Sequence, residues 1–175
     1  MVAEFLFHNI IKVKVFIKIK YFLLYSLLFS VCFSAFAKDT QEILSTTKVI
    51  ITDGDTIKFN NKKIRLHGID TPEIKQLCKN KNGEDYKCGV KAKLALINLI
   101  SSHQVKCSVH GKDRYKRLIA TCFVKNININ EWLVKEGWAL AYRRYSKDYV
   151  DEELFAKNNK LGLWRGDFLE PWKWR

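Results

Sequence analysis

The chain has 175 residues, 47% of them hydrophobic, and a formal net charge of +13 at pH 7. This length can bury one sizeable core but hardly two, which excludes a large multidomain enzyme and predicts a single domain. The positive charge favours polyanionic partners, because binding them releases counterions, although solubility alone could also explain a surplus of lysine.

The first 37 residues have the pattern of an export signal. Four lysines between positions 12 and 20 precede an apolar run, Tyr21 to Phe36, that ends in an A-x-A cleavage site at Ala37. We expect cleavage after Ala37 and a secreted or periplasmic protein. The alternatives are an uncleaved membrane anchor and a lipoprotein attached at Cys32, where the preceding residues are larger than a lipidated cysteine usually has.

Removing the leader leaves 27 basic and 17 acidic residues among 138, so the mature domain, residues 38–175, stays basic. Residues 46–69 alternate in hydropathy and are rich in β-branched residues. Asp53-Gly54 and Asn60-Asn61 interrupt them, which predicts three short antiparallel strands. Thr71-Pro72 ends the third strand, and we expect residues 73–89 to form a charged loop.

Leucines and isoleucines at helical spacing predict an amphipathic helix over residues 90–100. Two further strands, 104–109 and 118–124, are joined by a charged turn. Asn128 to Glu131 resembles a capping box that opens a helix reaching Glu136 and ending at Gly137. A last helix is predicted over residues 148–159.

Five strands and three helices predict an α+β domain. A small closed barrel would hide the edges of so short a sheet, and the five-stranded OB-fold is the natural candidate.

Four cysteines remain after the leader, at positions 78, 88, 107 and 122. An even number in an exported domain indicates two disulfides, for which three pairings exist. The spacing favours Cys78 with Cys88, closing a short polar loop, and Cys107 with Cys122, joining two neighbouring strands. A zinc site is the alternative, but the sequence lacks C-x-x-C spacing.

The segment from Asp53 to Glu73 carries the chemistry. Calcium and magnesium prefer oxygen ligands, and Asp55 and Asp70 supply two carboxylates from different strand ends, which a carbonyl such as that of Thr71 and waters could complement. A single Asp near a Gly is more often a turn residue. The clustering of carboxylates with arginines favours a cation site instead.

Three further side chains suit phosphodiester chemistry. Glu73 could orient or deprotonate a water molecule, with the ion assisting because a glutamate is a weak base. Arg65 and Arg117 could each bind a phosphate oxygen pair and neutralise the charge that develops on phosphorus. Tyr115 and Tyr142 could stack on a base or simply pack.

These motifs together resemble the staphylococcal-nuclease (thermonuclease) family across roughly residues 46–164. Order, spacing and residue type agree in four stretches, which are Ile51 to Thr56, Ile64 to Glu73, Asp113 to Arg117 and Leu161 to Trp164.

The resemblance implies an OB-fold barrel with three helices. It also implies a Ca²⁺-dependent, sugar-nonspecific nuclease that cleaves DNA and RNA and leaves a 5′-hydroxyl and a 3′-phosphate. It also implies a set of residue roles. Ca²⁺ would be bound by Asp55, Asp70 and the Thr71 carbonyl, with Asp53 in the outer shell. The scissile phosphate would be bound by Arg65 and Arg117, and Glu73 would be the general base. The nucleotide would be contacted by Arg114, Tyr115 and Tyr142. We expect a monomer without stable membrane association.

The chain departs from the family in places. Lys116 stands where the family often has Gly, the Cys78 to Cys88 stretch replaces a loop beside the nucleotide pocket, and the aromatic tail, residues 165–175, could clamp onto the barrel or stay loose. A binding module that keeps the fold without catalysis is the main alternative function. The enzyme is favoured because the chain retains all five residues expected to act in catalysis, namely Asp55, Arg65, Asp70, Glu73 and Arg117. A cationic protein aimed at membranes or polyanionic sugars would explain the charge but not the carboxylates.

Overall fold

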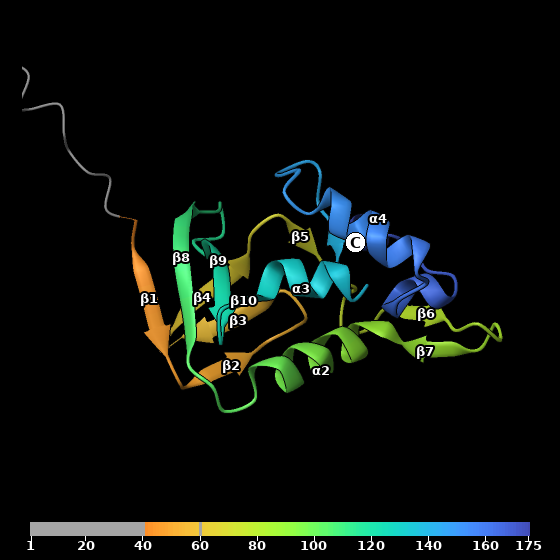
Figure 1. The fold of residues 1–175 in the computed structure, drawn as a ribbon, viewed down its shortest axis with the longest axis horizontal. Helices are drawn as coiled ribbons and strands as arrows, with labels where there is room; N and C mark the ends of the chain where they lie inside the picture. The colour runs from red at the N-terminus through yellow and green to blue at the C-terminus, as the bar shows by residue number, and fades with distance from the viewer. Residues whose placement is uncertain (1–40, 60) are drawn as a thin grey trace, which may run out of the picture. The chain divides into compact units, whose positions relative to one another are not determined.

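The structure is a computed structural model that describes residues 41–59 and 61–175. The expected leader and its cleavage site lie outside these residues. Within the described part, the main sheet contains seven strands (Figure 1), which are β1 Ile43–Thr46, β2 Val49–Ile51, β3 Thr56–Phe59, β4 Lys62–Leu66, β8 Val105–Lys112, β9 Leu118–Val124 and β10 Ile127–Asn128.

The sheet closes because its first strand is bent. Hydrogen bonding follows the order β1-β8-β9-β4-β3-β2, with β10 attached to β9. The two ends of this path, β1 and β2, are separated in the chain only by Thr47 and Lys48. Counting them as one bent strand gives a five-stranded barrel whose β4 and β9 run parallel. The predicted α+β fold with an OB-type barrel is confirmed.

The strands and their turns largely follow the prediction. The three antiparallel strands expected over residues 46–69 are β2, β3 and β4, and the later hairpin is β8 and β9. Cys107 lies opposite Cys122 in that hairpin and forms a disulfide with it, as predicted. Strand β1 was not predicted; its four residues alternate between exposed and half-buried, and none is fully buried.

Four α-helices and a 3-10 helix complete the described part (Figure 1), namely α2 Cys88–Ile100, α3 Ile129–Lys135, α4 Val150–Asn158, α5 Pro171–Trp174 and η1 Gly162–Arg165. The first three confirm the predicted helices, with α2 beginning two residues earlier than expected. The Asn128 side chain accepts hydrogen bonds from the N–H groups of Asn130 and Glu131, so this residue caps α3 as expected. No helix in the described part has the length and apolar character needed to cross a membrane.

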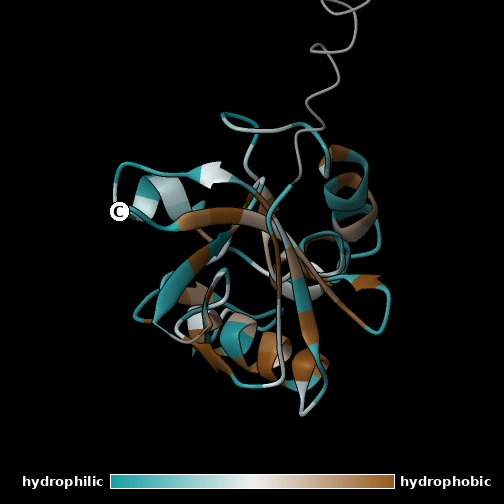
Figure 2. Cartoon of the chain, turned by 90° about the vertical axis from the view of Figure 1, so that its left-hand side faces the viewer, coloured by the Kyte–Doolittle hydropathy of each residue, from teal (hydrophilic) through white to brown (hydrophobic). Residues whose placement is uncertain are grey.

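The core lies between the barrel and helices α2 and α3. Ile57, Ile64 and Val105 from the strands and Leu96 and Leu133 from the helices are fully buried. Hydrophobic and hydrophilic residues follow one another along the strands and around the helices (Figure 2), so each element has one face for this core.

The prediction of a plain charged loop over residues 73–89 was wrong. Strands β6 Leu77–Lys79 and β7 Asp85–Lys87 form a separate hairpin there (Figure 1). Its residues are mostly exposed, so the usual apolar alternation is missing. A disulfide between Cys78 and Cys88, the predicted pair, links the hairpin to the first residue of α2. Both cysteines belong to a small buried cluster with Leu140 and Leu163.

The aromatic tail packs against the domain. Pro171 is buried, and Trp172 packs on a second small cluster that contains the Cys78–Cys88 disulfide. The buried Gln76 amide donates a hydrogen bond to the carbonyl of Leu169, at 2.7 Å. Of the two possibilities left open by the sequence, the docked tail is therefore the observed one.

Candidate active site

Two buried carboxylates form the centre of the site. Asp55 lies in the turn between β2 and β3, and Asp70 lies in β5 Ile69–Asp70, which pairs with β11 Leu140–Ala141. Asp55 is 2% exposed and Asp70 is fully buried. Burying an ionised carboxylate is costly unless it is paired, so these groups require cationic partners.

Arg65 supplies that partner to both aspartates. It lies on β4, and its Nη1 binds Asp55 Oδ1 while its Nη2 binds Asp70 Oδ1 at 2.6 Å. Burial would lower the pKa of the Arg65 guanidinium, but the charges of Asp55 and Asp70 outweigh this and raise it. Burial, followed by the charge of Asp55, raises the pKa of Asp70. The predicted trio is thus brought together.

Thr71 and Asp53 lie beside Asp55. The N–H of Thr71 donates to Asp55 Oδ2 at 3.0 Å, and the N–H of Asp55 donates to Asp53 Oδ1 at 3.1 Å. Burial and the neighbouring Asp55 charge raise the pKa of Asp53 to about 7. Asp53 therefore contacts the backbone of Asp55, and its outer-shell role stays a prediction.

Glu73 is held close to this centre by tight backbone packing. A Cβ on Gly89, in the first turn of α2, would lie 1.9 Å from the carbonyl oxygen of Glu73. Only glycine permits this approach. The Glu73 N–H also donates to the side chain of the buried Gln76, at 3.2 Å. The helix thus fixes the loop that presents the Glu73 carboxylate.

Arg117 does not contact the carboxylates. Its Nε binds Asp113 Oδ2 at 2.7 Å within its own turn. Lys116 adopts the left-handed conformation, with φ +64°, and its N–H donates to the Asp113 carbonyl at 3.0 Å. Glycine adopts this conformation more readily than lysine, and the family often has glycine here. In β9, Leu118 pairs with the buried Ile64 and faces the core. The preceding Arg117 then points to the same side as Arg65 by strand alternation.

The predicted nucleotide-contacting residues fall in two places. Arg114 lies over the exposed Tyr115 ring at 4.8 Å, in the turn before β9. Tyr142 follows β11 and stacks on Trp172, with ring centroids 5.3 Å apart and planes within 3°. These two rings line a cavity of about 380 Å³ together with Ala141, Arg143 and Arg144. Trp172 is a residue that sequence reasoning left unassigned.

Arg175 is the second residue that the sequence analysis missed. Its Nη2 binds Asp70 Oδ2 at 2.6 Å and its Nη1 binds Glu73 Oε1 at 2.8 Å. Burial opposes the charge on Arg175, but the hydrogen bonds to Asp70 and the charges of Asp70 and Glu73 raise its pKa. These contacts join residues about a hundred positions apart in the sequence, so no local pattern could predict them.

The donor set fits a hard divalent cation. Among residues 41–59 and 61–175, no group of three or more His, Cys, Asp or Glu side chains is arranged to hold a metal ion. The site instead offers the oxygens of Asp55 and Asp70, with Thr71 bound to Asp55 and able to contribute its carbonyl. Two carboxylates, one carbonyl and waters form a coordination set that suits Mg²⁺ or Ca²⁺.

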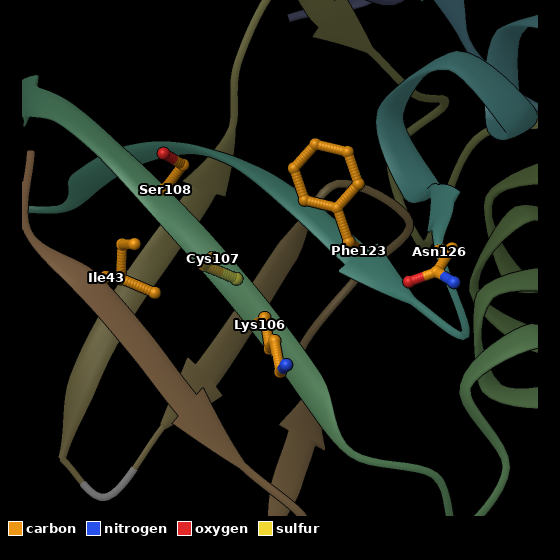
Figure 3. A pocket seen from close by; sticks show the side chains of 6 residues that line it. All are labelled: Ile43, Lys106, Cys107, Ser108, Phe123 and Asn126. Carbon is orange, nitrogen blue, oxygen red and sulfur yellow. The ribbon is translucent and has the colours of Figure 1, made fainter.

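Another pocket, of about 340 Å³, lies over β1, β8 and β9 (Figure 3). Its lining contains Lys106 as the one charged side chain and none of the residues of the carboxylate centre. It offers a cation or a phosphate no comparable set of groups, so the carboxylate centre is the candidate active site.

An OB-type barrel with buried carboxylates paired to arginines is the arrangement expected of a nuclease-like domain. A family model described as "Staphylococcal nuclease homologue" matches residues 63–166. The chain belongs to this family.

Several known proteins are similar to this chain. A "Succinoglycan biosynthesis protein ExoI" from Rhizobium meliloti (strain 1021) is 35% identical over 71% of this chain and 66% of its own length. An "Uncharacterized endonuclease" from Haemophilus influenzae is 36% identical over 75% of this chain and 73% of its own length. A "Probable staphylococcal-like nuclease CAN4" from Oryza sativa subsp. japonica is 33% identical over 79% of this chain, which covers 27% of that protein.

Proposed function

We propose that the protein is an exported, Ca²⁺-dependent nuclease that hydrolyses phosphodiester bonds in DNA and RNA and leaves 3′-phosphate and 5′-hydroxyl ends. The observation that carries this proposal is the grouping of Asp55, Asp70, Arg65 and Glu73 in one site. Relatives named as nucleases or endonucleases support the same chemistry. The net charge of +13 suits a polyanionic substrate.

Each residue has a role in this proposal. Asp55, Asp70 and the Thr71 carbonyl would hold the cation, which would neutralise phosphate charge and assist a bound water. Glu73 would take a proton from the attacking water while the water oxygen bonds to phosphorus; the bond from phosphorus to O5′ would break, and O5′ would take up a proton from solvent to leave as a hydroxyl. Arg65 and Arg117 would bind the non-bridging oxygens, where negative charge develops.

The proposed location rests on two features. The pair of disulfides, Cys78–Cys88 and Cys107–Cys122, is the kind of feature found in oxidising compartments. The pattern of the first 37 residues points to export. We therefore propose a secreted or periplasmic monomer.

The test combines cation dependence with one substitution. We expect the purified protein to degrade DNA and RNA in Ca²⁺ and to stop when the ion is chelated. Arg117→Ala should lower kcat about a hundredfold to a thousandfold, because one lost transition-state donor costs that much. Lys112→Ala, a loss of charge on the exposed end of β8, is the matched control and should change little. Full activity in chelator, or none at any Ca²⁺ concentration, would refute the proposal.

A binding module without turnover is the second candidate. One observation favours it, namely that Arg117 pairs with Asp113 and does not contact the carboxylate centre. One relative also has a name that refers to polysaccharide synthesis and not to a nuclease. End-labelled oligonucleotides separate the two functions, because a module would retain them on a filter without cutting them, whereas the proposed enzyme produces fragments with 3′-phosphates.

A further inference from the structure

The tail places a third guanidinium in the carboxylate centre. Arg175 follows α5, and its Nη1 and Nη2 contact Asp70 Oδ1 and Oδ2 at 3.2 and 2.6 Å. The same Nη1 lies 2.8 Å from Glu73 Oε1. Arg175 therefore bridges a candidate metal ligand and the candidate general base.

The segment that carries Arg175 is held in place by contacts independent of these ion pairs. Trp172 stacks on Tyr142, and the N–H of Lys79 donates to the carbonyl of Asp167 at 2.7 Å. The segment after Gly166 also lies beyond the family match, which ends at that residue. The position of Arg175 thus follows from the docking of the tail and does not depend on the ion pairs that it makes.

Both oxygens of Asp70 are engaged by arginine. Oδ1 accepts from Arg65 and Arg175, and Oδ2 accepts from Arg175. A divalent cation on Asp70 needs at least one of these oxygens, and its positive charge would lie close to the Arg175 guanidinium. A cation on Asp70 and the Arg175 guanidinium would therefore repel each other and compete for this carboxylate.

The charges lead to the same result. If each group is counted at unit charge, the carboxylates of Asp55, Asp70 and Glu73 exceed the guanidiniums of Arg65 and Arg175 by one negative charge, before the neighbouring Asp53 is counted. Without Arg175 two negative charges remain, the number that a divalent cation neutralises. Arg175 and the cation are thus alternative counter-charges for one group of carboxylates.

We propose that Arg175 sets the affinity of the site for its divalent cation by competing with the ion for Asp70 and Glu73. The inference rests on the proposed function. The side chain of Arg175 is 38% exposed, whereas that of Arg65 is 16% exposed, so Arg175 is the guanidinium that can turn towards solvent when an ion enters. Asp55 has no contact with Arg175, because its oxygens accept from Arg65, Thr56 and the N–H of Thr71.

The test measures Ca²⁺ binding to the full protein without nucleic acid, by isothermal titration calorimetry. Arg175→Gln should bind Ca²⁺ about tenfold more tightly than wild type, a change that corresponds to about 1.4 kcal/mol. Lys173→Gln is the matched control, since it removes one positive charge from the neighbouring helix α5, where Lys173 pairs with Glu170 at 3.0 Å and not with the site. This control should bind Ca²⁺ nearly as wild type does.

Urea unfolding with and without Ca²⁺ provides a readout that a structural role alone would not produce. Loss of the ion pairs should make Arg175→Gln less stable than wild type without Ca²⁺, and this deficit should shrink or reverse in saturating Ca²⁺. An equal deficit in both conditions would overturn the inference. Arg175→Lys, which keeps the charge but not the two-pronged contact, should have intermediate Ca²⁺ affinity and serves if the glutamine variant folds poorly.

The outcomes separate the two proposals. If Ca²⁺-dependent cleavage is seen but Arg175→Gln binds Ca²⁺ no more tightly than Lys173→Gln, the competition is refuted and the proposed function stands. If wild type and all variants bind no Ca²⁺, the calcium-dependent function and the competition are both refuted.

Discussion

Arg65→Gln tests whether one guanidinium compensates the buried carboxylate pair. The Arg65 side chain is 16% exposed and its partners Asp55 and Asp70 are 3% and 0% exposed, so solvent screens these ion pairs weakly. Removing one partner of a buried pair costs about 3–5 kcal/mol. Arg175 still binds Asp70 in the variant, which leaves Asp55 as the carboxylate without a cationic partner. We therefore expect the lower end of that range.

A loss of about 3 kcal/mol would lower Tm by roughly 10 °C for a domain of this size. The assay is urea unfolding followed by circular dichroism, with and without saturating Ca²⁺. Because a cation at Asp55 would replace the lost charge, the deficit of Arg65→Gln should be smaller in Ca²⁺. Glutamine is shorter than arginine and carries no charge, so the variant loses both the charge and the contacts made by Nη1 and Nη2.

Arg143→Gln is the matched control. Arg143 also pairs with a buried carboxylate, that of Glu153, but its own side chain is 48% exposed. Solvent can therefore reach and screen this pair, and we expect a loss nearer 1 kcal/mol, without any dependence on Ca²⁺. A loss below 1 kcal/mol for Arg65→Gln, or an equal loss with and without Ca²⁺, would contradict the role assigned to Arg65.

Two further predictions concern the turn and the hairpin around Arg117. Burial would raise the pKa of Asp113, but the hydrogen bonds and charge of Arg117 outweigh it and lower that pKa. The pair therefore stabilises the fold at pH values above the pKa of Asp113 in the unfolded chain. This contribution is lost as pH falls through the pKa of Asp113 in the folded protein. Asp113→Asn should thus cost under about 1 kcal/mol at pH 7 and nothing near pH 2, as urea midpoints would show; an equal cost at both pH values would contradict this. Replacing Cys107 and Cys122 together by Ala removes a link between positions 15 apart and should cost about 3 kcal/mol, measured as unfolding in urea without reductant. A double variant as stable as wild type would mean that the strand pairing alone holds the hairpin.

Local sequence patterns were sufficient for the barrel and most of the site. Alternating β-branched residues gave β2, β3 and β4, and the Asn128 cap gave the start of α3, because each signal acts within a few residues. The pairing of Cys107 with Cys122 was predicted from their spacing across two neighbouring strands, and the strand register places them opposite each other. The carboxylates and Arg65 were found because they lie within one short stretch of the chain.

The hairpin over residues 77–87 was missed for a physical reason. Its strands have three residues each and bury little apolar surface, so the alternation that marks a strand is absent. A usable signal was present in Asn82-Gly83, where Gly83 has φ +79° and the Asn80 side chain accepts the N–H of Asn82 at 2.8 Å. The turn chemistry, more than hydropathy, indicates this hairpin.

Contacts made by the tail could not be predicted from spacing. Trp172 and Arg175 reach Tyr142 and Asp70, and the second contact spans 105 positions. A tryptophan and an arginine near the end of a basic chain are equally compatible with an exposed tail. Only the packed domain, with Pro171 buried and Gln76 bound to the tail backbone, shows that they return to the site.

Arg117 and Arg175, the two site arginines other than Arg65, have one feature in common. Arg117 is bound to Asp113, and Arg175 is bound to Asp70 and Glu73, so each guanidinium satisfies a carboxylate within the protein. A substrate phosphate at Arg117 would have to replace Asp113, and a cation at Asp70 would have to replace Arg175. Because each exchange breaks one charged contact as it makes another, the net affinity for either ligand is lower than the new contacts alone would give. Substitutions at Asp113 and Arg175 should therefore raise ligand affinity, whereas substitutions at Arg117 and Asp70 should lower it.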